Sequence, residues 1–179
     1  MNWRDERLLQ RVRLCLLGRE LAARKPGGLL VDLRLASVCE YDPAEAAAVR
    51  AAGIVGARVS PQRWRHDRFA IDIDGHTNAF TNFYTRLLFG CCVLKVASPR
   101  QFRQWYYDRL EPWVHYIPVA ADLSDLQTHL AWCMAHPRDC QQIAHAGQQV
   151  VLGMTHAGER QQAIASLSST GLAPLRLAA

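Results

Sequence analysis

The sequence has no uninterrupted apolar run of about 18 residues, the length that a membrane-spanning helix requires. Its first seven residues are mostly charged or polar, and no apolar segment follows them, so a secretory signal peptide is not predicted either. From these two absences we expect a cytoplasmic protein.

Lysine is nearly absent, since Lys25 and Lys95 are the only two among the 21 basic residues. The arginines that make up the rest are spread along the chain, and the net charge is +5. Nucleic-acid-binding arms carry their basic residues in clusters, so no nucleic-acid partner is predicted. The charge balance suits a small anionic ligand.

The six cysteines form no C-x-x-C pair, and no His/Cys spacing is typical of a zinc module. We expect reduced, mostly buried thiols. The glycine-rich motifs G-x-G-x-x-G and G-x-x-x-x-G-K-[ST] are also missing, so neither a dinucleotide oxidoreductase nor a P-loop enzyme is supported.

Helical and strand-like segments alternate along the chain. Apolar spacing, proline starts and glycine stops predict helices over residues 5–24, 43–52, 77–89, 99–107, 122–135 and 137–153, with a short final helix, and strands over residues 29–33, 69–73, 91–96 and 114–117. This order predicts an α/β fold with a Rossmann-like open parallel sheet flanked by helices, in one domain over residues 1–165. A loosely ordered tail is expected over residues 166–179. Ligands of such sheets bind beyond the carboxyl ends of the strands.

The second predicted strand ends in Asp72-Ile73-Asp74, a D-x-D spacing that can hold a divalent metal and a diphosphate. Alternate residues of a strand share a face, so the two carboxylates are expected to point together. The other interpretation is that Asp72, which lies inside an apolar run, pairs with a cation in the core.

The turn that follows, Gly75-His76-Thr77-Asn78, leads from a strand into a predicted helix. Backbone N–H groups at such a turn hold phosphate well, whereas the alternative is an ordinary helix cap at Thr77 or Asn78. The aromatic residues near Tyr106 leave a similar choice between stacking on a base or sugar and closing the core.

Three blocks of the sequence together resemble glycosyltransferase family 90, over about residues 69–159. These blocks are FAIDIDGHTN at residues 69–78, LLFGCCVLKV at residues 87–96, and WYYDRLEPWVHYIPV at residues 105–119, which DLSDL follows at residues 122–126. The family joins capsule-associated proteins, lipopolysaccharide-modifying transferases and protein O-glucosyltransferases. The turn after the second strand looks like that of the bacterial lipopolysaccharide-modifying branch, because an arginine that eukaryotic members carry near Thr81 is absent.

The resemblance implies a two-domain GT-B arrangement, of which this chain would be the C-terminal, donor-binding half. It implies transfer of a sugar from a nucleotide-diphosphate donor to a cell-surface glycan acceptor such as lipopolysaccharide or capsule, without a bound metal or other cofactor. The donor-binding positions that it implies are Arg11, or Arg13 in an alternative register, with Gly75, His76, Thr77, Asn78, Ala79 and Phe80. Lys95 would add positive charge if it points out of the strand end.

The general base of the family is an aspartate of the N-terminal, acceptor-side domain, so no catalytic residue is assigned in this chain. The alternative function is therefore a truncated, non-catalytic donor-binding remnant or one chain of a split transferase. In either case a homo-oligomer or a partner chain is expected, and a lipid-linked acceptor would bring peripheral membrane contact.

Overall fold

The computed structural model describes residues 1–24, 31–38, 41–75, 77–78 and 81–169. The described helices are α1 (Gln10–Arg24), α2 (Pro43–Ala51), α3 (Asn82–Leu88), α4 (Leu126–Ala135), α5 (Pro137–Leu152) and α6 (His156–Ser169), with the 3-10 turns η2 (Pro61–His66) and η3 (Tyr107–Arg109). The strands are β1 (Phe69–Asp72), β2 (Cys92–Val96) and β3 (Ile117–Val119).

The three strands form one parallel sheet in the order β1-β2-β3. In its register Asp72 of β1 lies beside Lys95 of β2, and Lys95 in turn lies beside Pro118 of β3. Every residue of the central strand β2 is buried, as expected for a nearly continuous apolar strand with helices on both faces. The prediction of an open parallel sheet in an α/β fold is confirmed for these three strands.

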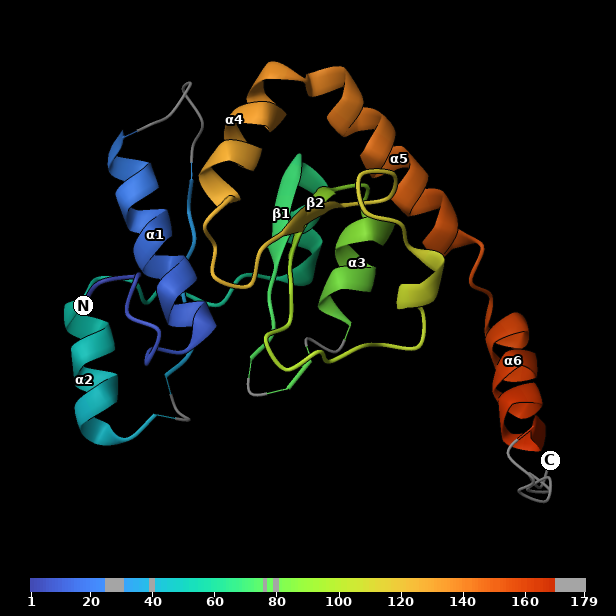
Figure 1. Cartoon of the computed structure of the whole chain (residues 1–179), viewed down its shortest axis with the longest axis horizontal. Coiled ribbons are helices and arrows are strands. Elements are labelled where there is room, and N and C mark those ends of the chain that lie inside the picture. Colours follow the sequence, from blue (N-terminus) through green and yellow to red (C-terminus); the bar gives the residue numbers. More distant parts are fainter. Residues whose placement is uncertain (25–30, 39–40, 76, 79–80, 170–179) are drawn as a thin grey trace.

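Successive side chains of β2 point to opposite faces of the sheet, and each face has its own core. Leu94 and Val96 pack in one cluster with leucines of α1 and with α4. Val93 packs on the other face, against Phe83 and Leu87 of α3. Figure 1 shows α1 and α3 on either side of the sheet, with α4 and α5 arching past it.

The N-terminal part of the chain packs as a separate layer of α1 and α2. Val12 and Leu16 of α1 meet Val49 of α2 in a third apolar cluster. Asp42 caps α2 by accepting from the N–H groups of Ala44 and Glu45. Residues 31–33 of the strand predicted over 29–33 are not in a strand, and residues 29–30 lie outside the described part. The nearest pairing is an isolated parallel bridge between Leu35 and Val55.

Several predicted boundaries are wrong. No helix spans residues 99–107, because Gln101 has φ of 57° and a left-handed residue ends a right-handed helix. Helix α3 begins at Asn82 rather than at residue 77, and α1 begins at Gln10 rather than at residue 5. Strand β3 begins at Ile117 rather than at residue 114, and it contains Pro118 instead of ending before it. Proline is tolerated there because β3 is an edge strand.

The last helix, α6, has no buried residue and extends away from the rest of the chain (Figure 1). Two of its side chains make described polar contacts with the segment around η3. Glu159 accepts from Trp105 Nε1 at 2.8 Å and from the guanidinium of Arg109, and Gln162 also accepts from Arg109. Of the tail predicted over 166–179, residues 166–169 are helical, and 170–179 lie outside the described residues. None of the described helices is long and apolar enough to cross a bilayer.

Replacement of Glu159 by alanine is expected to release α6 while the rest of the fold stays intact. A helix without buried side chains depends on such local contacts, and its opening is uncoupled from global unfolding. Hydrogen exchange should therefore quicken in α6 and remain unchanged in α5, and the melting temperature should stay within about 2 °C of the wild type. Equal exchange in α6 of both proteins would contradict this prediction.

Candidate functional site

The carboxyl ends of the three parallel strands meet at one edge of the sheet. The segments that leave this edge begin at Ile73, Ala97 and Ala120. Ligands of open parallel sheets bind at this edge, since loops rather than strands surround it there. The sequence places its most polar turn, after β1, at the same edge.

Arg11 reaches this turn from the first turn of α1. Its Nε donates to the carbonyl oxygen of Asp74 at 2.9 Å, and its Nη2 donates to that of Ile73 at 3.1 Å. A Cβ on Gly75 would lie 3.2 Å from the Arg11 Cζ, so glycine permits the guanidinium to approach the backbone closely. The structure therefore brings together Arg11 and Gly75, two residues 64 positions apart that the sequence analysis had assigned to one site.

The side chain of Arg13 makes no hydrogen bond with the described residues of the turn after β1. Its Nε donates to the Trp3 carbonyl at 2.8 Å, and its Nη2 donates to that of Asp122 at 3.1 Å. With two donors engaged there, Arg13 ties the N-terminal segment to the loop before α4. Of the two registers that the sequence left open, Arg11 is the one at the turn.

A buried ionic network lies directly behind the turn. Lys95 Nζ is 2.9 Å from Asp72 Oδ2 and 3.3 Å from Asp74 Oδ1, so the two carboxylates do point to one side, as their spacing predicted. Arg86 of α3 donates to Asp72 Oδ1 at 2.8 Å. Asp72 is fully buried, and the second interpretation of this residue, a carboxylate paired with cations in the core, is confirmed.

The network and its burial shift the pKa values of its two cations. Burial is the largest single effect on Lys95 and lowers its pKa, but Asp72, Tyr107 and Asp74 together raise it by more, so the net pKa lies above the usual range. Burial also lowers the pKa of Arg86, against the opposing effect of Asp72. The Arg86 guanidinium stacks 4.6 Å above the ring of Trp64, which is a favourable place for a desolvated cation.

A cavity of about 530 Å³ opens beside the turn, at the ends of β2 and β3. Its polar lining includes Lys95, Ser98 and Arg103, and its aromatic lining includes Tyr107 and Tyr116. The volume falls in the range of small-molecule sites, which combine apolar walls with a few polar groups. The aromatic walls suit a flat ring or a sugar face.

Asn78 connects the turn to the wall of this cavity. Its Oδ1 accepts from Gln104 Nε2 at 3.2 Å and from the Tyr107 hydroxyl at 3.2 Å. Thr77 is exposed, and its backbone carbonyl accepts from the Gly75 N–H at 3.0 Å. His76, Ala79 and Phe80, the other predicted donor-site residues, lie outside the described part of the chain. Of the predicted set, Arg11, Gly75, Thr77, Asn78 and Lys95 lie on or next to this one edge.

Sequence patterns did not single out Arg86 or the loop that carries Arg103 and Gln104. Arg86 lies one helix after the D-x-D segment, and the buried carboxylate of Asp72 was the signal that a cation had to be nearby. The loop was hidden by the incorrect helix over residues 99–107. Tyr107 was noticed only as one of several aromatic residues.

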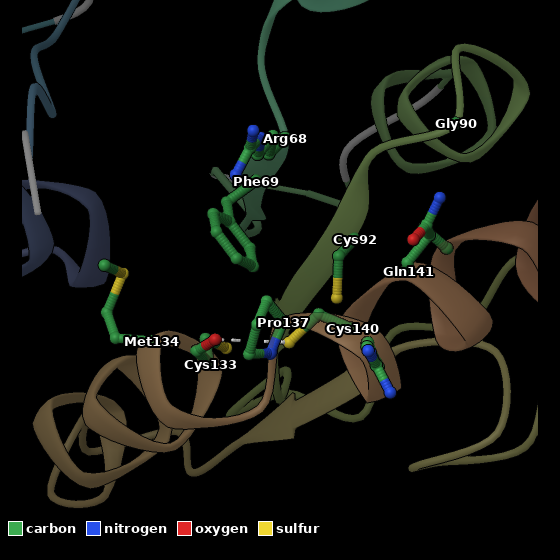
Figure 2. A pocket seen from close by; sticks show the side chains of 11 residues that line it. Arg68, Phe69, Gly90, Cys92, Cys133, Met134, Pro137, Cys140 and Gln141 are labelled. Atoms are coloured by element: carbon green, nitrogen blue, oxygen red, sulfur yellow. Dashed lines mark hydrogen bonds between the residues drawn. The ribbon is translucent and has the colours of Figure 1, made fainter.

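A second cavity, of about 390 Å³, lies at the opposite edge, where β1 and β2 begin (Figure 2). Thiols of Cys92, Cys133 and Cys140 point toward one another there, from β2, α4 and α5. Burial raises the pKa of all three, to about 12 for Cys133, so they are protonated near neutral pH. Protonated thiols are poor nucleophiles, which agrees with the predicted role of buried cysteines. Cys39 lies outside the described residues.

The fold is a parallel α/β domain, and this edge of its sheet is a candidate ligand site built from an arginine of α1, a glycine turn and an aromatic cavity. The sequence profile of glycosyl transferase family 90 matches residues 35–156. The chain belongs to glycosyl transferase family 90.

Relatives of the chain include proteins of viruses and animals. It is 38% identical over 92 residues to the uncharacterized protein 035R of Invertebrate iridescent virus 3, which covers 51% of this chain and 8% of that protein. It is 38% identical over 82 residues to protein O-glucosyltransferase 2 of Danio rerio, covering 46% and 16% of the two chains. With protein O-glucosyltransferase 1 of Rattus norvegicus it shares 38% identity over 71 residues, covering 40% and 18%. The matched segments therefore span less than a fifth of these relatives.

Proposed function

We propose that this chain is the donor-binding part of a glycosyltransferase that transfers a sugar from a nucleotide-diphosphate sugar to a cell-surface glycan such as lipopolysaccharide or capsule. Membership of glycosyl transferase family 90 supports sugar transfer in general, and relatives named protein O-glucosyltransferase agree with it. The C-terminal half of a GT-B arrangement, the bacterial branch and a cytoplasmic location are parts of the same proposal.

The observation that carries the proposal is the contact of Arg11 with the turn after β1. The guanidinium lies against Gly75, and two of its donors are used on backbone carbonyls. A guanidinium has five N–H groups, so several remain for an anionic ligand. Bidentate donation to phosphate oxygens is the contact that arginine makes best.

The diphosphate would lie between Arg11 and residues 75–80, with Lys95 adding positive charge from the strand end. The cavity lined by Tyr107 and Tyr116 would hold the nucleoside or the sugar. Cations and N–H groups at the diphosphate stabilise the negative charge that develops on the leaving group as the sugar departs. No step in this scheme uses a metal.

The attacking hydroxyl needs a general base. The family resemblance puts this base on an aspartate of the acceptor-side domain, so the proposal assigns none among the described residues. A donor-binding remnant, or one chain of a split transferase, is therefore the second candidate. Hydrolysis or transfer of a bound donor separates the two candidates, since a remnant binds the donor without turning it over.

Binding of a nucleoside diphosphate should raise the melting temperature of the purified chain. A ligand at a hundredfold excess over its Kd stabilises the folded state by about 2.7 kcal/mol. We expect this with UDP or GDP and not with a CMP-sugar, which lacks a diphosphate. The measurement is a thermal shift confirmed by isothermal titration calorimetry. No shift with UDP, GDP or their sugars at millimolar concentration would overturn the proposed function.

A further inference from the structure

Lys95 is held on two sides by carboxylates and lines the cavity with its buried side chain. Its Nζ lies 2.9 Å from Asp72 Oδ2 and 3.3 Å from Asp74 Oδ1. The aromatic rings of Phe83 and Tyr107 face the same nitrogen at 5.8 and 5.6 Å. A buried ammonium that lacked its carboxylates would lose its proton, because desolvation disfavours the charged form.

Asp72 cannot itself reach a ligand in the cavity. It is fully buried, and its two oxygens face Arg86 and Lys95. The strand register explains the second contact, because Asp72 and Lys95 are neighbours on adjacent parallel strands. Two carboxylates and two cations thus balance within the network, and the carboxylate of Asp72 is the member that contacts both cations.

We propose that Asp72 is a positioning residue for donor binding, which holds the Lys95 ammonium charged and in place beside the turn that receives the diphosphate. This inference rests on the proposed function. Asp72 acts through Lys95 and touches no ligand atom. Arg86 supplies the second positive charge beside the buried carboxylate of Asp72.

The groups that face Lys95 determine how it titrates. Asp72 of β1 and Asp74 of the turn after it contact the ammonium directly. Tyr107 of η3 and Tyr116 of the segment before β3 lie near it, and Arg86 of α3 acts on it through Asp72. Asp72→Asn keeps the size of the side chain and removes its charge. Burial of Lys95 is then opposed by Tyr107 and Asp74 without Asp72, so the pKa of Lys95 should fall, and the ammonium should lose its proton at a lower pH than in the wild type.

The experiment is isothermal titration of UDP, or of GDP if it binds more tightly, at about pH 7 and about pH 9.5, on the wild type and Asp72→Asn. We expect the wild-type affinity to change by less than about twofold and that of the variant to fall about tenfold at the higher pH, since a charged contact with phosphate is lost. A purely structural role of Asp72 would weaken binding equally at both pH values.

The double variant Asp72→Asn/Lys95→Arg supplies a rescue, because arginine does not titrate in this range. Its affinity should be as independent of pH as that of the wild type. The inference would be overturned if the affinity of the double variant fell at the higher pH, or if the affinity of Asp72→Asn changed with pH as little as that of the wild type. The proposed function would stand in both cases.

If Asp72→Asn does not fold, the same titration is done on Asp74→Asn. Asp74 also contacts the Lys95 ammonium, over the longer of the two distances. A loss of affinity at the higher pH that is smaller than the loss expected for Asp72→Asn would support the inference. An affinity that depends on pH as little as that of the wild type would overturn it. Absence of any nucleoside diphosphate binding by the wild type would overturn the proposed function, and the inference with it.

Discussion

Replacement of Arg11 by alanine is expected to weaken nucleoside diphosphate binding by about 10- to 100-fold, the largest effect of any single change at the site. A hydrogen bond to a charged group contributes about 1.5–3 kcal/mol, and Arg11 also holds the Ile73 and Asp74 carbonyls of the turn. Calorimetric titration of both proteins with UDP and GDP measures the change.

Arg19→Ala is the matched control. Arg19 lies on the same helix, and it too donates to a backbone carbonyl, that of Ala52. Ala52 is the C-cap residue of α2, so this contact is on the α2 side of α1. Affinity should therefore change little in Arg19→Ala. Equal loss in the two variants would mean that α1 acts through its general stability or charge, and unchanged affinity in Arg11→Ala would remove Arg11 from the site.

Gly147→Ala should destabilise the fold by about 1–3 kcal/mol, the range for overpacking a close contact. Gly147 lies in the middle of α5, where alanine would normally stabilise a helix. A Cβ at this position would clash with the backbone carbonyl oxygen of His115 and lie 2.9 Å from Leu87 Cδ2. This carbonyl belongs to the main chain just before β3, so it cannot rotate away from the added methyl group as a flexible side chain could. Denaturant unfolding followed by circular dichroism measures the loss.

Gly153→Ala provides the comparison, because a Cβ there would meet its nearest atoms at 3.4 Å, an ordinary contact, and the residue has φ of −71°. This variant should remain within about 0.5 kcal/mol of the wild type. If Gly147→Ala were equally stable, the close packing of α5 against the segment before β3 would be incorrect.

The two cavities lie at opposite edges of the sheet and differ in chemistry. The cavity at the carboxyl edge has cationic and hydroxyl groups and adjoins the turn. The cavity at the other edge is lined by protonated thiols and apolar side chains, with Arg68, Arg138 and Gln141 among its polar residues. Of the two, the first adjoins the turn that Arg11 contacts and has two tyrosines in its wall, and the proposed function therefore belongs there.

Some predicted elements were confirmed because local signals were sufficient to define them. The apolar run from Cys91 to Val96 predicted a buried central strand, and Pro43 and Pro137 each mark the start of a helix. The helix predicted over residues 99–107 was wrong, also for a local reason. Pro99 suggested a helix start, whereas the left-handed backbone of Gln101 made a loop whose side chains line the cavity.

The sequence by itself determined the α/β class, the turn at Gly75 and the pairing of this turn with an arginine before the first strand, through short-range patterns and a family resemblance. The tertiary structure placed Arg11, and not Arg13, at this turn, because the position of each side chain depends on the rotation of α1 against the sheet. It also decided the partners of Asp72. Spacing shows that Asp72 and Asp74 share a face, but only the strand register and the packing of α3 place Lys95 and Arg86 against the buried carboxylate.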